Sequence, residues 1–422
     1  MMLESRLNDL LDQHLELFTD RVERIVLAFS GGLDSCVLLH LLASRPRDCS
    51  LLIWHINHGL QDCADEMESF CASLAAEYGI EFRVSHLNLG DFTSNIESIA
   101  RSARYAEFEA NLGAQDILLT AHHADDQAET FLLNLMRSAG SAGLRGIAPI
   151  KPLADTRLVR PLLEIKRSEL TCFANQQGLQ WFDDPSNSSD RYNRNYLRNQ
   201  VIPIIKNRWP GFVQSIASVC HIQAETQQLL DEIAAVDYQQ CCISPGEEPT
   251  RLSQRQLMAL SNARQKNLAR FWLRENDCHS LPARKLQELI RQLHARTDAQ
   301  PCIVATGYDI RIYAQQLFIV RHKGPFNLQQ NYDMAHTQTL EIDSINLKIS
   351  RADVLQSLAV DDCGQSISIQ FRLDPQAGNP NAHRLKHLFQ KYQVAPWLRV
   401  QTPQIFIDDE LKAIWLDKSC QY

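Results

Sequence analysis

A Ser-Gly-Gly turn followed by an aspartate is the clearest chemical signal in the sequence. Residues 30–35 read Ser-Gly-Gly-Leu-Asp-Ser and lie between an apolar run, residues 25–29, and a segment with helical spacing of apolar residues from Val37 onward. Glycines let a backbone turn sharply close to a ligand, and the free N–H groups at a helix N-terminus attract phosphate. No lysine follows the glycines, so this is not a P-loop of the Gly-Lys-Ser/Thr kind.

The turn also carries a carboxylate, Asp34, between the hydroxyls of Ser30 and Ser35. Phosphate would repel a carboxylate unless a cation lay between them, and Mg²⁺ favours one or two carboxylates together with phosphate oxygens. Asp34 is therefore the candidate Mg²⁺ ligand. The alternative is a plain Gly-Gly turn with Asp34 as a helix cap. The segment alone does not decide between these interpretations.

A second cluster, residues 120–130, combines two histidines with three acids. A helix that begins near Asp125 would place Asp126 and Glu129 on one face, with His122 directly before it. Two carboxylates on one face would attract a cationic substrate or a metal. Alternatively, Asp125 and Asp126 cap the helix and Glu129 is solvated. Together with the Ser-Gly-Gly turn, the first interpretation is favoured.

Arginines recur at two further places. Arg101 and Arg104 lie one helical turn apart, and Arg104 is the candidate for bidentate contact with phosphate, whereas Arg101 is better explained as a surface residue. Arg194 and Arg198 alternate with Tyr and Asn, which suits contact with RNA because stacking and phosphate pairing act together. Residues 137–144 are either a substrate loop or a plain connector.

These clusters need a scaffold that brings them together. Strands are expected at residues 25–29, 51–57, 82–87, 117–121 and 158–159, and helices at 35–42, 64–78, 96–112, 125–137 and 167–177. This alternation predicts right-handed crossovers and a doubly wound parallel α/β sheet covered on both faces. Ligands bind at the C-terminal ends of such strands, so the residues around Ser30, His55 and His122 should meet at one edge.

After residue 181 the regular alternation of strands and helices ends. Residues 182–196 predict a linker, residues 196–295 are helical with breaks near 244–249 and 278–282, and residues 302–321 predict a hairpin. Short strands follow at 340–342, 347–349, 367–373, 405–407 and 412–416, with a helix near 382–393. We predict three domains, residues 1–205, 206–325 and 335–422: the α/β sheet, an all-helical domain and a small α+β domain. The chain stops soon after Leu416, so no closing strand is expected in the last one.

Charge and composition limit the partners. The net charge of −8 argues against nucleic acid, yet residues 251–296 carry ten Lys/Arg against three acids, and residues 384–399 carry basic residues without any acid. Segregated basic segments favour a polyanionic partner. The 12 cysteines include no Cys-x-x-Cys pair, which favours reduced thiols over disulfides or zinc. We see neither a signal peptide nor a membrane span, and we expect a cytoplasmic protein without a membrane partner.

The motifs together resemble the tRNA(Ile)-lysidine synthases, a family of PP-loop ATP pyrophosphatases. The resemblance rests on the signature at residues 30–35 and on motifs at 55–60, 101–105, 121–130, 160–163, 184–187, 194–198 and 394–399. It spans the chain and is most specific in the first domain. Two departures are Ser138, where the family usually has a further glycine, and a C-terminal helix poorer in lysine, whose contribution to tRNA binding should be smaller.

The resemblance implies ATP-dependent ligation of L-lysine to C2 of cytidine 34, in the CAU anticodon of a tRNA(Ile), through an adenylated cytidine and with release of AMP and pyrophosphate. This ligase reaction changes the codon and amino-acid specificity of the tRNA from Met to Ile. The implied cofactors are ATP and Mg²⁺, and the implied partners are the tRNA and L-lysine. The ATP contacts would be Ser30, Gly31, Gly32, Leu33, Asp34, Ser35 and His55. Catalysis would involve Asp34, Asp126, Glu129 and Arg104, with the two acids holding the amines of lysine, and tRNA would contact Arg194, Arg198, Arg384 and Lys386.

Two alternatives remain. A tRNA thiolase of the same superfamily would pass sulfur to the adenylated base, but such enzymes generally need paired cysteines or an iron–sulfur cluster. The absence of a Cys-x-x-Cys pair counts against this alternative, although Cys36 and Cys63 lie near the site by sequence. A nucleotide-sensing RNA-binding protein would not need Asp34, Asp126 and Glu129 together. The sequence leaves open the general base, the exclusion of tRNA(Met) and the oligomeric state, for which a homodimer is one alternative.

Overall fold

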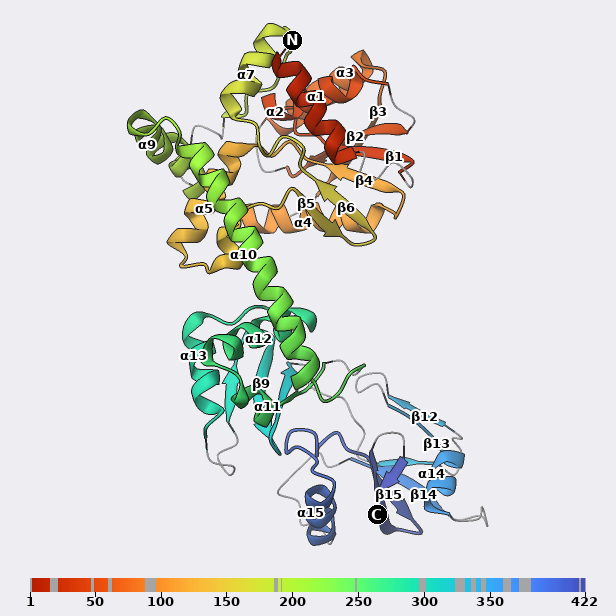
Figure 1. Cartoon of the computed structure of the whole chain (residues 1–422). Coiled ribbons are helices and arrows are strands. Elements are labelled where there is room, and N and C mark those ends of the chain that lie inside the picture. Colours follow the sequence, from red (N-terminus) through yellow and green to blue (C-terminus); the bar gives the residue numbers. More distant parts are fainter. Residues whose placement is uncertain are drawn as a thin grey trace. The chain divides into compact units, whose positions relative to one another are not determined.

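The computed structural model forms two compact units, residues 1–229 and 230–422, which are described separately (Figure 1). It describes residues 2–15, 22–46, 49–59, 63–87, 96–185, 189–190, 192–246, 249–295, 301–322, 331–334, 339–342, 347–359, 366–371, 381–416 and 419–421. Leu60, Ser186 and Asn187 of the sequence motifs lie outside these ranges, as does the end of the strand expected at 367–373. Within the described residues, no helix has both the length and the apolar composition of a membrane span.

The first unit is built on a six-stranded sheet in the order β3-β2-β1-β4-β6-β5. The strands are β1 (Arg24–Ala28), β2 (Ser50–Asn57), β3 (Glu81–His86), β4 (Asp116–Leu119), β5 (Ile150–Leu153) and β6 (Thr156–Val159). Five strands are parallel and β5, which the sequence did not reveal, pairs antiparallel with β6. The strand order reverses between β1 and β4, which is where ligands bind in such sheets. The predicted doubly wound sheet is confirmed.

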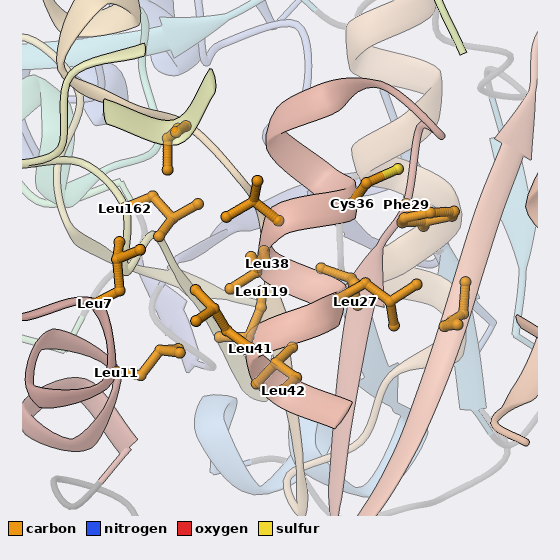
Figure 2. Close-up of a cluster of buried hydrophobic side chains, with 14 of the residues drawn as sticks. Leu7, Leu11, Leu27, Phe29, Cys36, Leu38, Leu41, Leu42, Leu119 and Leu162 are labelled. Carbon is orange, nitrogen blue, oxygen red and sulfur yellow. The ribbon is translucent and has the colours of Figure 1, made fainter. Parts of the chain in front are cut away.

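Helices cover both faces of this sheet. They are α1 (Met2–Leu15), α2 (Leu33–Ala43), α3 (Ala64–Glu77), α4 (Ile96–Asn111) and α7 (Arg167–Gln176). Helix α5 (Ala124–Met136) follows β4 and packs against later helices. On one face Leu27 of β1 packs with residues of α1 and α2, and Figure 2 shows Leu7 and Leu11 beside Leu41. The other face buries Val26 with residues of β2 and α4. A strand buried on both faces explains the continuous apolar run at residues 25–29.

The first unit continues beyond the sheet through α6 (Ser141–Leu144), α8 (Asn193–Tyr196), a π-helical turn η3 (Leu197–Val201), α9 (Ile202–Arg208) and the start of α10 (Phe212–Cys241). Ala128 and Phe131 of α5 pack against Val213 and Ile216 of α10. The domain boundary that we placed between residues 205 and 206 falls inside α9. The three predicted domain ranges stay predictions.

The second unit begins with the helical region expected from the sequence. Helices α11 (Gln254–Ala259), α12 (Asn262–Glu275) and α13 (Ala283–Gln292) accompany a four-stranded sheet in the order β7-β10-β9-β8. Its strands are β7 (Leu252–Ser253), β8 (Cys302–Val304), β9 (Tyr308–Tyr313) and β10 (Gln316–Arg321). The β9–β10 pair is the predicted hairpin.

The end of the chain is a small α+β region. It contains β11 (Asn331–Asp333), β12 (Thr339–Ile342), β13 (Leu347–Ser350), α14 (Arg351–Leu358), β14 (Ile367–Gln370), α15 (Ala382–Lys391), β15 (Gln404–Ile407), β16 (Glu410–Leu416) and β17 (Ser419–Gln421). The expectation that no strand closes this region is wrong, because β17 pairs antiparallel with β16. Three residues suffice for this edge strand, which is why it escaped a search for longer apolar runs.

Candidate active site

The Ser-Gly-Gly turn joins β1 to α2. Gly32 is the N-cap of α2, which begins at Leu33, and Gly31 has a φ of +74°. A Cβ atom at position 31 would lie 2.9 Å from the sulfur of Cys71 on α3. Gly31 therefore has two independent reasons to be glycine, its left-handed backbone and the thiol packed against it. The contact with Cys71 shows that the main chain of the turn lies close to α3.

Two hydroxyls organise the turn from within. The Ser35 hydroxyl donates to the Gly32 carbonyl at 2.9 Å, and the Ser30 and Ser35 hydroxyl oxygens lie 3.2 Å apart. The Gly32 N–H points to the Ser30 oxygen at 3.4 Å. These short-range contacts hold the turn at the positive end of the α2 dipole, an arrangement suited to a phosphate group.

Asp34 lies in the first turn of α2 with 26% of its side chain exposed. Its Oδ2 is 3.4 Å from Nε2 of His123, whereas its Oδ1 is buried and has no hydrogen-bond partner among the described residues. A buried carboxylate oxygen without a partner is costly, and a divalent cation would satisfy it. Among the described residues there is no cluster of three or more His, Cys, Asp or Glu that could hold a metal. The unpartnered oxygen of Asp34 fits Mg²⁺ bound by one carboxylate plus phosphate oxygens.

His123 is the N-cap of α5, and its ring lies between the carboxylates of Asp34 and Asp126. Its Nδ1 accepts from the Asp126 N–H at 3.4 Å, and its own backbone N–H donates to Asp126 Oδ2 at 3.0 Å. The alternative, in which Asp125 and Asp126 cap this helix and Glu129 is solvated, is right only for Asp126, which completes the capping box around the N-cap His123. Asp125 instead binds Lys206 and the Arg167 N–H, and Glu129 is buried. Although burial alone would lower it, the pKa of His123 is raised, because Asp126, Asp34 and Asp125 surround the ring.

Asp126 and Glu129 share one face of α5, as predicted, and both are bound by arginines. Arg194 donates through Nε to Glu129 at 2.6 Å and through Nη2 to Asp126 at 2.7 Å. Arg198 donates through Nε and Nη2 to the two oxygens of Glu129, at 2.6 and 3.0 Å, and through Nη2 to Asp126 at 3.4 Å. Two carboxylates and two guanidinium groups make a cluster with no net charge.

The two carboxylates of this cluster are more deeply buried than its two arginines. Glu129 has 1% of its side chain exposed, and Asp126 has 12%. Burial would raise the pKa of Asp126, but the pKa is lowered because His123 and Arg194 stabilise the carboxylate. Burial would lower the pKa of Arg198, which is nevertheless raised through its hydrogen bond and charge pairing with Glu129. Asp126 and Arg198 therefore keep their charges inside the cluster.

A cavity of about 320 Å³ lies next to this cluster. Its walls include Glu129, Arg198, Asp125, Arg167 and Lys206. Lys206 of α9 is paired with Asp125, whose Oδ2 also accepts the backbone N–H of Arg167 at 2.9 Å. No local pattern assigned Lys206 to this site, because it lies 81 residues from its partner.

His55, near the end of β2, and His58, directly after it, lie at the same edge of the sheet. His55 is 3% exposed, and its Nδ1 lies 2.9 Å from the carbonyl oxygen of Phe29, directly before the Ser-Gly-Gly turn. Arg104 of α4 donates to Nε2 of His58 at 2.8 and 3.2 Å. Burial, together with Arg104 and His55, lowers the pKa of His58 to about 4. The structure thus brings His55 to the turn and ties Arg104 to a neutral histidine.

The strand ends that we expected to meet do meet, because β2, β1 and β4 are adjacent and parallel. The remaining predicted site residues lie in the second unit. Arg384 on α15 is 3.6 Å from Glu410, and Lys386 is exposed on the same helix. Their contact with tRNA stays a prediction, as do the roles assigned to the residues of the first unit.

Comparison with known families and proteins agrees with these motifs. A family model described as a PP-loop domain matches residues 2–205, one described as a TilS substrate binding domain matches residues 252–318, and one described as a TilS substrate C-terminal domain matches residues 367–417.

Curated relatives match nearly the whole chain. The tRNA(Ile)-lysidine synthase of Shigella flexneri is 35% identical over 408 residues, covering 94% of this chain and 92% of the relative. That of Escherichia coli O157:H7 is 35% identical over 410 residues with the same coverage. That of Vibrio vulnificus strain CMCP6 is 34% identical over 432 residues, covering 98% of this chain and 95% of the relative.

Two solved structures resemble part of the chain more distantly. One is a U34-tRNA thiolase, NcsA, from Methanococcus maripaludis with its 4Fe–4S cluster, which is 20% identical with a TM-score of 0.46 and covers 53% of this chain and 80% of its own. The other is an NH3-dependent NAD synthetase from Campylobacter jejuni, which is 11% identical with a TM-score of 0.30 and covers 53% of this chain and 93% of its own. At such scores we draw no conclusion from either.

Proposed function

The chain belongs to the tRNA(Ile)-lysidine synthase family, and from this premise we propose that it joins L-lysine to C2 of cytidine 34 in the CAU anticodon of a tRNA(Ile). The reaction consumes ATP, releases AMP and pyrophosphate, and forms a carbon–nitrogen bond. It is therefore a ligase reaction, and its place would be the cytoplasm, where tRNA, ATP and lysine are available. The proposal holds equally for a monomer and for a homodimer.

The first step activates the base. The C2 carbonyl oxygen of cytidine attacks the α-phosphorus of ATP, and the bond to pyrophosphate breaks. Ser30–Ser35 would receive the departing pyrophosphate, because the turn lies at the positive end of α2. Asp34 would hold Mg²⁺, which would neutralise charge that develops on pyrophosphate. His55 would support the turn through the Phe29 carbonyl, and its direct contact with ATP stays part of the proposal.

The second step attaches lysine. The ε-amine attacks C2, loses a proton, and the C2–O bond breaks so that AMP leaves with the oxygen. Asp126 and Glu129 would hold the cationic amine groups of lysine near the activated base, because they are carboxylates on one face of α5 beside the turn. Arg104 would contact phosphate or the cytidine region, and Arg384 and Lys386 would contact tRNA. We assign no general base.

One observation supports this proposal most strongly. The Nε2 atom of His123 lies 3.4 Å from Oδ2 of Asp34 and 3.5 Å from Oδ2 of Asp126. The pyrophosphate turn and the acidic face therefore lie at one edge of the sheet, within reach of one substrate. A nucleotide sensor would need the turn alone, whereas a reaction between an adenylated base and an amine needs both.

The structure argues against sulfur transfer in place of lysine transfer. A sulfur relay needs a reactive thiolate, and thiolates are favoured by exposure and nearby positive charge. Near the turn, burial raises the pKa of Cys71 to about 12 and also raises the pKa of Cys36. Both thiols are therefore protonated and packed in the core, where they act as small apolar side chains.

The test is a reconstituted reaction. Purified protein, ATP, Mg²⁺, L-lysine and an unmodified CAU-anticodon tRNA(Ile) transcript should yield AMP and pyrophosphate in equal amounts. Omitting lysine should stop the reaction at the adenylated tRNA. A requirement for a sulfur donor in place of lysine would establish the thiolase alternative instead.

A further inference from the structure

The acid pair proposed to hold lysine is already occupied by cations of the chain itself. Arg194 and Arg198 together donate five hydrogen bonds to Asp126 and Glu129, at distances from 2.6 to 3.4 Å. Both oxygens of Glu129 accept, and so does Oδ1 of Asp126. A lysine ammonium group that entered this site would therefore meet two carboxylates that are already paired with arginines.

Displacement of these arginines by free lysine is unfavourable. A guanidinium group matches a carboxylate with two parallel N–H donors, whereas an ammonium group is a point charge with one donor for each acceptor. The arginines are also tethered to the site, so they rebind at an effective concentration far above that of a free amino acid. Lysine can hold the acids only when the arginines have another partner.

The arginines are placed so that they can change partner. Their side chains are 21% and 25% exposed, more than the side chains of Asp126 and Glu129 that they contact. They lie on α8 and on the π-helical turn η3, where the Ile202 N–H bonds to the Leu197 carbonyl five residues back. A π-turn contains one residue more than the α-helix needs, and such turns are frequent at functional sites. Arg198 therefore lies on an irregular turn and not in the regular part of α9.

We propose that Arg194 and Arg198 form an internal plug that keeps the acid pair closed to lysine until a phosphate polyanion draws the two guanidinium groups away. This inference rests on the proposed function, in which Asp126 and Glu129 bind the amines of lysine. Phosphate groups come from two sources, the triphosphate of ATP and the tRNA backbone, and either offers the arginines bidentate acceptors. Lysine would then bind after the polyanion.

Thermodynamic linkage between lysine binding and polyanion binding makes the proposed plug measurable. If a polyanion tightens lysine binding by some factor, lysine must tighten binding of that polyanion by the same factor. Coupling between two sites on one protein is typically about 5- to 150-fold. We expect at least about tenfold here, because two guanidinium groups must leave the acids.

The experiment measures the dissociation constant of radiolabelled L-lysine by equilibrium dialysis. The arms are the full-length protein alone, with a non-hydrolysable ATP analogue and Mg²⁺, with tRNA(Ile) transcript alone, and with both. The wild-type protein alone should bind lysine at least about tenfold more weakly than in at least one loaded arm. The arm that tightens lysine binding identifies the source of the phosphate. Equal affinity in all arms would overturn the plug.

Two variants separate the plug from a general effect of charge. Arg198→Gln removes one of the competing cations, and the free variant should bind lysine at least about tenfold more tightly than the free wild type. Arg208→Gln is the matched control, since Arg208 is an exposed arginine of α9 that lies over the Trp209 ring at 5.7 Å. It should bind lysine as the wild type does. Equal affinities for the two variants would contradict the plug.

Folding and function are controlled separately. If Arg198→Gln fails to fold, Arg198→Lys keeps the charge with a weaker hold, and an unchanged lysine affinity in that variant would overturn the inference. Lysidine formation by the wild type is measured in the same preparations. Absence of lysidine would refute the proposed function, whereas lysidine formed by an enzyme that binds lysine equally with and without polyanion would refute the plug alone.

Discussion

Alanine at position 31 tests the geometry of the Ser-Gly-Gly turn. Gly31 has a φ of +74°, and a Cβ there would lie 2.9 Å from the Cys71 sulfur and 3.3 Å from Cδ1 of Phe70. A left-handed backbone costs a non-glycine residue about 1–2 kcal/mol. Forcing a methyl group into a packed site costs about 1–3 kcal/mol more. Gly31→Ala should therefore lower the free energy of unfolding of the first unit by about 2–5 kcal/mol, and weaken ATP binding.

The assay is native-state hydrogen exchange of the β1 amides, which reports on the first unit by itself. The neighbouring Gly32 is the matched control, because its φ is −75° and a Cβ there would meet, among the described residues, only the Ser30 hydroxyl, at 3.5 Å. Gly32→Ala exchanges one N-cap residue for a poorer one and should cost about 0.5–1 kcal/mol.

A double-mutant cycle divides the cost into its two parts. Cys71→Ala removes the atom nearest to the added methyl, so it should relieve the packing share in Gly31→Ala and leave the backbone share. The expected coupling free energy is about 1–3 kcal/mol. A coupling below about 0.5 kcal/mol, or a Gly31→Ala variant as stable as Gly32→Ala, would refute the steric reasoning.

Three further predictions follow from single sites. Ser138 follows the C-cap of α5 with a φ of +57°, so Ser138→Gly should raise the free energy of unfolding by about 1 kcal/mol, measured by hydrogen exchange in α5; a destabilised variant would contradict this assignment. Arg104→Gln should raise the pKa of His58 from about 4, but not to the ordinary value of about 6.5, because burial is its largest cause; NMR titration of the ring measures it, and an unchanged pKa would contradict the Arg104 contact. Since the folded pKa is the lower one, His58 favours folding fully above about pH 6.5, and this contribution is lost as pH falls from there to about 4, less steeply in the variant. Asp34→Ala should abolish AMP release while filter retention of tRNA stays near wild type, and simultaneous loss of both would count against the proposed role of Asp34.

The sequence predicted those features that depend on local pattern or on parallel topology. The continuous apolar run at residues 25–29 and the glycines after it specify a buried strand and a turn, and the structure has both. Parallel pairing of β1 with β2 and β4 then brings Asp34, His55 and His123 to one edge. No knowledge of side-chain contacts was needed for that step.

The sequence did not reveal how charges pair across the fold. Arg194 and Arg198 lie 65 and 69 residues from Glu129, and no local pattern links them. Their Tyr- and Asn-rich surroundings in the sequence predict contact with RNA. In the structure they are instead paired with Asp126 and Glu129, the acids proposed to bind lysine. The N-cap of α5 was missed for a related reason, because His123 is a rare cap and Asp125 and Asp126 are common ones.

The most direct test of the account is the mass of nucleoside 34 after reaction with ATP and isotope-labelled lysine. The account predicts that cytidine 34 gains one labelled lysine and loses one water, and that this product disappears in Glu129→Gln. A nucleoside in which sulfur replaces oxygen, or an unchanged cytidine beside released AMP, would contradict the claim that the turn and the acid pair serve one ligation.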